Sequence, residues 1–245
     1  MTEDRVQKTE GGGQKIVDGN QETKFCPSSS VLRPLIAVID YGMGNLHSIA
    51  KALQYADPEV DVQIVSDADV ILRADRVVFP GVGAIRDCMH ALNQSGLSAV
   101  IQSVAKTKPL LGICLGMQAL LTDSEENGGT KGLGIVSGHV VHFSEALMDS
   151  HGNNLKIPHM GWNQVHQKPH PLWDKIPQDS RFYFVHSYYA VPDDTSVVAA
   201  TTEYPDAFAC ALAQANIFAV QFHPEKSQAV GLQLLNNFLH WDGQV

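Results

Sequence analysis

The first half of the chain alternates short apolar runs with segments whose apolar positions recur at helical spacing. Residues 35–40 (LIAVID) predict a strand, and residues 45–56 predict a helix in which Asn45 is placed to cap the first turn. Further strands are predicted over 62–65, 76–80 and 109–114, and further helices over 84–93 and 115–121. Continuous apolar strands that alternate with helices predict a parallel sheet covered on both faces, which binds ligands beyond the carboxyl ends of its strands.

The second half of the chain, from about Gly132, is rich in strand-like runs without helical stretches between them. These runs are GHVVHF, WNQVHQ, RFYFVHSYYA, SVVAATTE, FACALAQ and IFAVQFH. We expect a mainly antiparallel region attached to the first sheet, followed by a closing helix over 227–241.

Residues 1–34 follow neither pattern. They are rich in Gly, Gln, Glu, Lys and Ser and show neither strand nor helix periodicity, which predicts a disordered extension before one domain over 35–245. This segment has charges throughout and no apolar core of a signal peptide.

Composition narrows the class of protein. The chain has 44% apolar and 18% charged residues, as globular domains do, and a net charge of -9 with a pI near 5.6. Without a basic stripe, a nucleic-acid partner is not expected, and no apolar run approaches the length of a membrane span. The four cysteines are far apart and lack metal-ligand or paired redox spacing, so we expect reduced thiols in the cytoplasm.

Cys114 lies between two glycines where a predicted strand passes directly into a predicted helix. The pattern G-x-C-x-G at such a junction is the thiol form of a nucleophile elbow, in which Gly112 and Gly116 allow the sharp turn. Free amides at the helix start favour a thiolate. The alternative is a small structural cysteine packed beneath a helix.

A thiol nucleophile needs a base and a group that orients the base. His223 ends an apolar strand, and Pro224 holds it extended. In an extended segment His223 and Glu225 project to the same side and can share a hydrogen bond. A surface loop is the alternative for this short motif.

A third signal is the loop PGVG at residues 80–83, which follows a predicted strand of the same sheet. Its glycines leave backbone amides unobstructed, so that they can stabilise an oxyanion, although a tight strand-helix turn has the same composition. Three such signals at strand ends of one sheet predict an acyl-transfer site.

The motifs PGVGA, GICLGMQ and QFHPEKS, in this order, resemble the class I glutamine amidotransferases from Leu35 to the C-terminus. DYGMGN, PHMGWN, FYFVHSYY and the lysine after H-P-E resemble, within that family, the glutaminase subunits of imidazole glycerol phosphate synthases in histidine biosynthesis. The resemblance implies an α/β, flavodoxin-like fold with a parallel central sheet, helices on both faces and a strand-rich antiparallel C-terminal part.

The resemblance also implies roles for individual residues. Cys114 would attack glutamine, His223 would move protons and Glu225 would orient His223. The remaining assignments are Val82 and Leu115 for the oxyanion hole, Gly81, Gly83, Gln118, Glu126, Ser187 and Tyr188 for glutamine, and Met160, Trp162, Tyr183 and Lys226 for a partner interface. The choice of Glu126 over Glu125 rests on the resemblance alone.

The resemblance implies an enzyme that hydrolyses L-glutamine through a cysteinyl thioester and needs no metal or organic cofactor. It forms a heterodimer with a (β/α)8 barrel cyclase subunit that receives the ammonia, and free activity is low until the partner binds and the Gly81–Val82 peptide rearranges. Two alternatives stay open: an amidotransferase that serves another pathway, and a scaffold that only binds a synthase.

Overall fold

The computed structural model describes residues 33–144, 147–148 and 152–244, which belong to the unit Arg33–Val245. The predicted extension over 1–34 lies outside the described residues except for its last two positions, and it stays a prediction. Among the described residues, no helix has the length and apolar character needed to span a bilayer.

The first half forms a parallel sheet, as the alternating pattern predicts. Its strands lie in the order β2 (Asp61–Val65), β1 (Leu35–Ile39), β3 (Arg76–Gly81), β4 (Leu110–Cys114) and β14 (Ile217–Val220), and each neighbouring pair is parallel. β14 comes from the run IFAVQFH, which we had placed in the antiparallel half. A strand near the C-terminal end of the sequence thus completes the parallel sheet, beside the strand that carries Cys114.

The strand-rich half continues the same sheet beyond β14, mainly with antiparallel pairs. The order is β13 (Ala207–Gln214), β11 (Tyr188–Pro192), β7 (Gly138–His142), β5 (Asp123–Ser124) and β6 (Thr130–Lys131), while β12 (Val198–Glu203) pairs with β13 and β9 (His166–Gln167) pairs with β12. β8 (His159–Gln164) and β10 (Arg181–His186) form a separate two-stranded antiparallel sheet.

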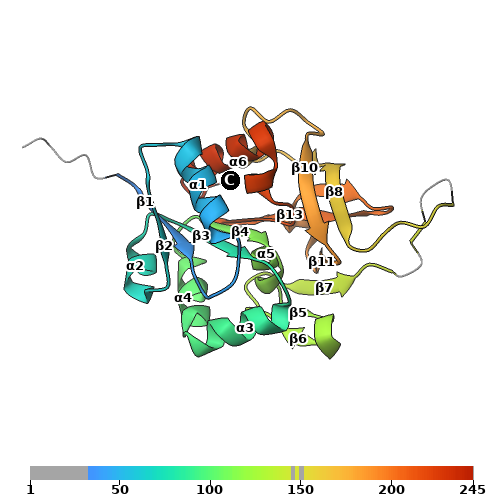
Figure 1. The fold of residues 1–245 in the computed structure, drawn as a ribbon, viewed down its shortest axis with the longest axis horizontal. Coiled ribbons are helices and arrows are strands. Elements are labelled where there is room, and N and C mark those ends of the chain that lie inside the picture. The colour runs from blue at the N-terminus through green and yellow to red at the C-terminus, as the bar shows by residue number, and fades with distance from the viewer. Residues whose placement is uncertain (1–32, 145–146, 149–151, 245) are drawn as a thin grey trace, which may run out of the picture. The chain divides into compact units, whose positions relative to one another are not determined.

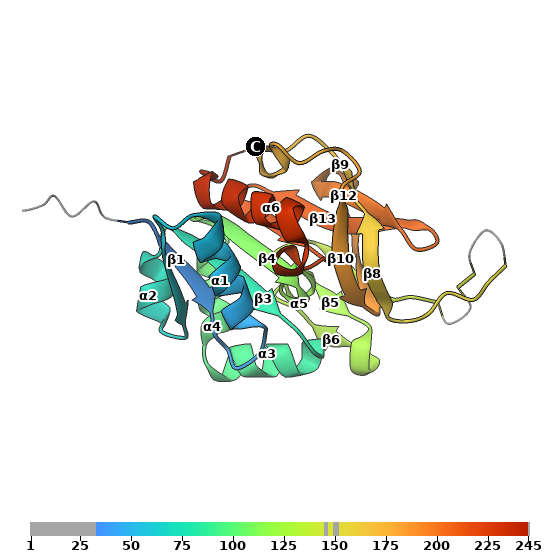
Figure 2. The same cartoon turned by 45° about the horizontal axis from the view of Figure 1, so that its top comes forward.

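Helices cover both faces of the parallel sheet, as Figures 1 and 2 show. One face carries α1 (Leu46–Ala56) and α6 (Gln228–His240), and the other carries α2 (Ala68–Arg73), α3 (Ile85–Gln94), α4 (Leu97–Val104) and α5 (Leu115–Ala119). Single 3-10 turns lie at η1 (Glu126–Gly128), η2 (Pro171–Trp173), η3 (Thr195–Val197) and η4 (Pro224–Lys226).

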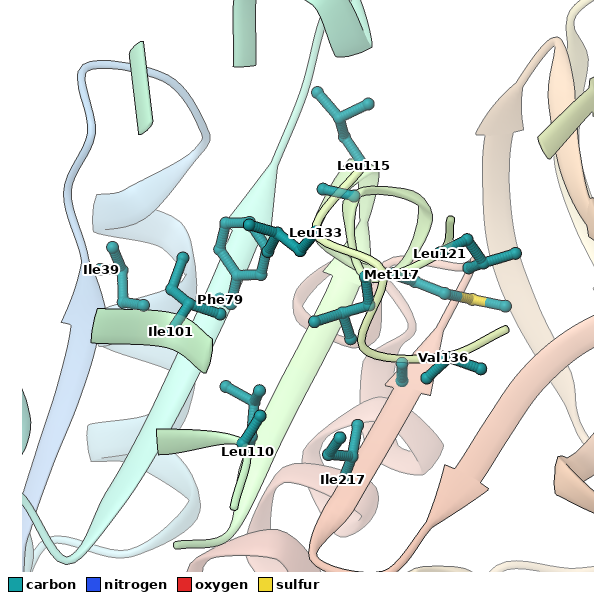
Figure 3. Close-up of a cluster of buried hydrophobic side chains, with 14 of the residues drawn as sticks. Ile39, Phe79, Ile101, Leu110, Leu115, Met117, Leu121, Leu133, Val136 and Ile217 are labelled. Carbon is teal, nitrogen blue, oxygen red and sulfur yellow. The ribbon is translucent and has the colours of Figure 1, made fainter. Parts of the chain in front are cut away.

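The strands separate two hydrophobic cores because successive side chains point to opposite faces. From β1, Ile39 packs under α2 to α5 while Val38 packs under α1 and α6. Figure 3 shows the first of these clusters, in which Phe79 of β3, Ile101 of α4 and Leu110 of β4 are fully buried together. The full burial of both faces explains why these strands read as continuous apolar runs.

Some local predictions were wrong. Asn45 stands at the N-cap of α1, but its side chain makes no capping hydrogen bond. The run RFYFVHSYYA is two strands, β10 and β11, which part at Ser187 and enter different sheets. The short helices α2 and α4 were not predicted, since each is only six to eight residues long and gives too short a stretch for a helical period to stand out.

Gly116 allows α5 to pack against β3. A Cβ atom on Gly116 would lie 1.9 Å from the Phe79 carbonyl oxygen, a backbone atom of a central strand that cannot yield. We predict that Gly116→Ala lowers the free energy of unfolding by about 3 kcal/mol or more, since overpacking against rigid backbone lies at the upper end of such costs.

Gly112→Ala is the matched control, from the strand that leads into the same turn. Its Cβ would meet only neighbours at 3.1 to 3.3 Å, so we expect a loss well below that of Gly116→Ala in urea unfolding. Equal losses for the two variants would contradict this explanation of the turn.

Candidate active site

Cys114 occupies the sharp turn between β4 and α5. Its backbone has φ 55° and ψ -111°. A positive φ is rare for residues other than glycine and costs conformational energy. The register pairs Gly81 with Cys114 and Val220 with Ile113, so the carboxyl ends of β3, β4 and β14 meet at the sulfur. The elbow predicted from the sequence therefore has its strained geometry, in a residue that is 7% exposed.

His223 and Glu225 reach this edge from the end of β14. The imidazole Nδ1 lies 2.9 Å from Oε1 of Glu225, and the two side chains are 3% and 0% exposed. The path differs from the extended one that we expected, because Pro224 begins the single turn η4 that contains Glu225. A neutral or protonated ring with hydrogen on Nδ1 donates to the carboxylate and turns Nε2 toward the cavity.

The charge of His223 is set by opposing effects. Burial alone lowers the pKa of the ring, but Cys114 and Glu225 together outweigh burial and raise the pKa to about 10. Nε2 is buried and makes no hydrogen bond of regular geometry within the described part of the chain, yet the Cys114 sulfur lies close enough to it to raise the pKa of the ring. The arrangement places a protonated imidazole beside the Cys114 sulfur, a combination that can supply a nucleophile and its acid.

The loop after β3 borders the sulfur. Gly83 has φ 94°, and the Tyr41 hydroxyl donates to the Pro80 carbonyl at 2.9 Å, which fixes the start of the loop. A Cβ atom at Gly81 would lie 2.6 Å from that hydroxyl, so only glycine fits. The amide of Leu115, as the first residue of α5, has no acceptor within its own helix and can serve an oxyanion.

A cavity of about 320 Å³ opens over Cys114. Its lining contains most of the residues predicted for catalysis and glutamine binding, which are Val82, Gly83, Cys114, Leu115, Gln118, Glu126, Ser187, Tyr188 and His223. The lining also contains Lys226, which was predicted for the partner interface, and Pro158, Val185 and His186, which were predicted for neither. Of the predicted catalytic and glutamine-binding residues, Gly81 and Glu225 are not part of this lining.

Glu126 and Glu125 take separate positions. Glu126 lines the cavity, and its Oε2 accepts from the Ile85 amide at the start of α3 at 3.1 Å. The Glu125 carboxylate accepts from the His142 amide and faces a different depression. Glu126 is thus the carboxylate of this pair that can meet a ligand ammonium in the cavity.

The Tyr188 backbone is oriented by the sheet. The Phe143 amide donates to the Ser187 carbonyl, which makes His142 and Tyr188 a non-hydrogen-bonded pair of the antiparallel ladder. In such a pair the backbone amide and carbonyl of each residue point away from the partner strand. The Tyr188 carbonyl accepts hydrogen bonds from Nε2 of Gln118 at 3.0 Å and from Nδ1 of His186 at 2.8 Å. The Tyr188 amide lies on the same edge of the strand and is available to a ligand carboxylate.

Sequence reasoning gave His186 and His159 no catalytic role, and the structure places them as a buried support. Nδ1 of His159 lies 3.0 Å from Nε2 of His186. Burial lowers the pKa of His159 to about 4 and of His186 to about 3, so the rings are neutral and pass hydrogen bonds toward Tyr188.

Gln221 is a further residue that sequence reasoning missed. It is fully buried, and its Nε2 lies 3.7 Å from the Cys114 sulfur. Its position two residues before His223, in a run predicted as a strand, was the available signal, because alternation along such a strand would put both side chains on one face.

The residues predicted for a partner interface gather on the outer face of the β8–β10 sheet. Met160 and Trp162 are 61% and 40% exposed, and Trp162 is paired with Tyr183 with ring centroids 6.2 Å apart. Nζ of Lys226 lies 5.8 Å from the Tyr183 ring centre, which is a cation–π contact. Since Lys226 also lines the cavity, this apolar face adjoins the sulfur-containing site.

Comparisons with known proteins agree with this geometry. A sequence-family model described as glutamine amidotransferase class-I matches residues 37–241. The chain is 63% identical over 209 residues to the imidazole glycerol phosphate synthase subunit HisH of Methylococcus capsulatus, covering 84% of this chain and 96% of that protein. It is 59% identical to the protein of the same name from Nitrosococcus oceani, covering 85% and 98%.

Solved structures share the fold. PurLQS from Thermotoga maritima superposes with a TM-score of 0.62 at 17% identity, over 85% of this chain and 98% of that chain. A crystal structure of a glutamine amidotransferase superposes with a TM-score of 0.60 at 15% identity, over 83% and 96%. The predicted fold is confirmed, and the chain belongs to the class-I glutamine amidotransferases, in the group of imidazole glycerol phosphate synthase HisH subunits.

Proposed function

We propose that this protein is the glutaminase subunit of an imidazole glycerol phosphate synthase and acts in histidine biosynthesis in the cytoplasm. The observation that carries the proposal is the buried arrangement of Cys114, His223 and Glu225 at the end of β4, in a chain 63% identical to a HisH subunit. A protein that only binds a synthase has no need of this charged, strained and buried set of side chains.

The chemistry follows from the charges of the site. The Cys114 thiolate adds to the side-chain carboxamide carbon of L-glutamine, and the oxyanion accepts hydrogen bonds from the Val82 and Leu115 amides. Protonated His223 gives its proton to the departing nitrogen, which leaves as ammonia while a thioester forms.

The thioester is hydrolysed by the reverse proton movement. His223 accepts a proton from water as the water oxygen attacks the thioester carbon, and glutamate leaves while the thiolate and imidazolium are restored. Glu225 holds the ring through Nδ1 during both steps. We assign the glutamine ammonium to Glu126 and Gln118, and the carboxylate to backbone amides at Ser187 and Tyr188.

The ammonia passes to a partner with a (β/α)8 barrel that binds the outer face of β8–β10. The apolar and aromatic character of Met160, Trp162 and Tyr183 suits such an interface, as does their position beside the cavity. Partner binding then sets the Gly81–Val82 peptide in the orientation that stabilises the oxyanion. Gly83, at φ 94°, gives the loop the backbone freedom for this change.

Removal of the sulfur separates the two activities of the complex. We predict that Cys114→Ala, mixed with the barrel synthase, loses glutamine-dependent synthesis by at least about a thousand-fold because no thioester can form, yet keeps synthesis from ammonium salts. The measurements are glutamate release and product formation with each nitrogen source.

Cys210→Ala is the matched control, since this cysteine is also buried but belongs to β13. It should retain both activities. Loss of the ammonium-dependent reaction in Cys114→Ala, or undiminished use of glutamine, would overturn the proposed division of labour; stimulation only by a synthase of another pathway would change the substrate assignment.

The outer face of β8–β10 gives a separate prediction. Trp162→Ala should weaken binding to the barrel synthase by about ten-fold or more, since a partly exposed tryptophan in an interface is a frequent hot spot. Titration calorimetry measures the affinity. Tyr55→Ala, which removes an exposed aromatic ring from α1, is the control and should bind normally; equal affinities for the two variants would place the interface elsewhere.

A further inference from the structure

Gln221 stands directly beside the nucleophile. The parallel register of β14 with β4 ends at Val220 opposite Ile113, so Gln221, the first residue after β14, follows directly beside the end of β4 that carries Cys114. The Gln221 side chain is fully buried and reaches the sulfur at 3.7 Å.

The orientation of the Gln221 amide is determined by a chain of contacts that begins at Tyr188. The Tyr188 carbonyl can only accept, so the Gln118 atom 3.0 Å away is Nε2. The same Nε2 lies 2.9 Å from the Gln221 side chain and must donate to its oxygen. The remaining polar atom of Gln221, the one that faces Cys114, is therefore the amide nitrogen.

We propose that Gln221 is a catalytic residue that donates a hydrogen bond to the Cys114 thiolate. Its amide carries no charge, so this donor persists whichever way the proton of His223 has moved. The bond is strongest to the anionic sulfur and weaker to the neutral thioester, so it stabilises the sulfur as leaving group when the thioester is hydrolysed. The proposal rests on the glutaminase function proposed above.

Gln118 holds Gln221 in this role and joins it to the substrate subsite. Both Nε2 hydrogens of Gln118 are engaged, by Tyr188 and by Gln221. Its own Oε1 is the atom that it can offer to the glutamine ammonium. His186 supports the same Tyr188 carbonyl from the other side, so the acceptor on which the amide orientations depend is fixed.

Alkylation of Cys114 by iodoacetamide tests the proposal without glutamine or partner. The pH profile of the alkylation rate reports the thiolate. The titratable groups that act on the sulfur are His223, which precedes η4, and Tyr41 from the turn after β1, with Glu225 and His186 beyond His223. In Gln221→Leu, we expect the rise of the profile to move to higher pH and the rate at pH 7 to fall about ten- to hundred-fold, the range for a hydrogen bond to a charged group.

Two further variants complete the test. Thr202→Val removes another fully buried polar group, from β12, and should leave the alkylation profile unchanged. Gln221→Glu keeps an oxygen for Gln118 but turns a carboxylate oxygen toward the sulfur, so it should displace the profile at least as far as Gln221→Leu. If Gln221→Leu does not fold, Gln221→Glu alone provides the test.

The outcomes separate this inference from the proposed function. An unchanged alkylation profile in folded Gln221→Leu or Gln221→Glu would overturn the role of Gln221, even in a protein that hydrolyses glutamine. A displaced profile in a protein whose unsubstituted form releases no glutamate with the barrel synthase would keep the thiolate donor and reject the glutaminase.

Discussion

The strained backbone at Cys114 is the constraint on which the rest of the site depends. A positive φ at this residue ends β4 and starts α5 without an intervening loop, which holds the sulfur at the meeting point of three parallel strands. The strain persists because both sides are tightly packed: Gly116 touches the Phe79 carbonyl, and the surrounding residues of β4 are fully buried. The other side chains of the proposed triad need only follow the end of a neighbouring strand to come close to the sulfur.

Charge and burial then work together. A histidine and a glutamate, each almost free of solvent contact, would be costly to bury alone, but the ring, the carboxylate and the sulfur compensate one another. The other hydrogen bonds around the site come from neutral donors. Gln221 donates to the sulfur, and His159 and His186 lie behind the Tyr188 carbonyl. The proposed catalytic centre is thus continuous with the hydrogen bonds that shape the predicted glutamine subsite.

The sequence was sufficient for the features that strand ends and short motifs define. The parallel sheet, the elbow at Cys114 and the pairing of His223 with Glu225 depend on local patterns, so they could be predicted from residues near one another in the chain. The class-I fold itself came from the resemblance.

The remaining features depend on packing between distant segments. The orientation of Gln221 is set by Tyr188 through Gln118, and the placement of β14 next to β4 joins segments a hundred residues apart. Likewise, no local signal distinguishes β10 from β11, because the chain changes sheets at Ser187 only where tertiary contacts require it. No local signal shows either that Glu126 lines the cavity whereas Glu125 faces a different depression, because this depends on the packing around η1.

The measurement that tests the central claim most directly is the titration of His223 by nuclear magnetic resonance of its ring nitrogens. The account predicts an imidazolium at pH 8, because Cys114 and Glu225 raise its pKa to about 10, and a lower pKa in Glu225→Gln. A ring that is neutral at pH 8 in the unsubstituted, folded protein would contradict the thiolate–imidazolium pair.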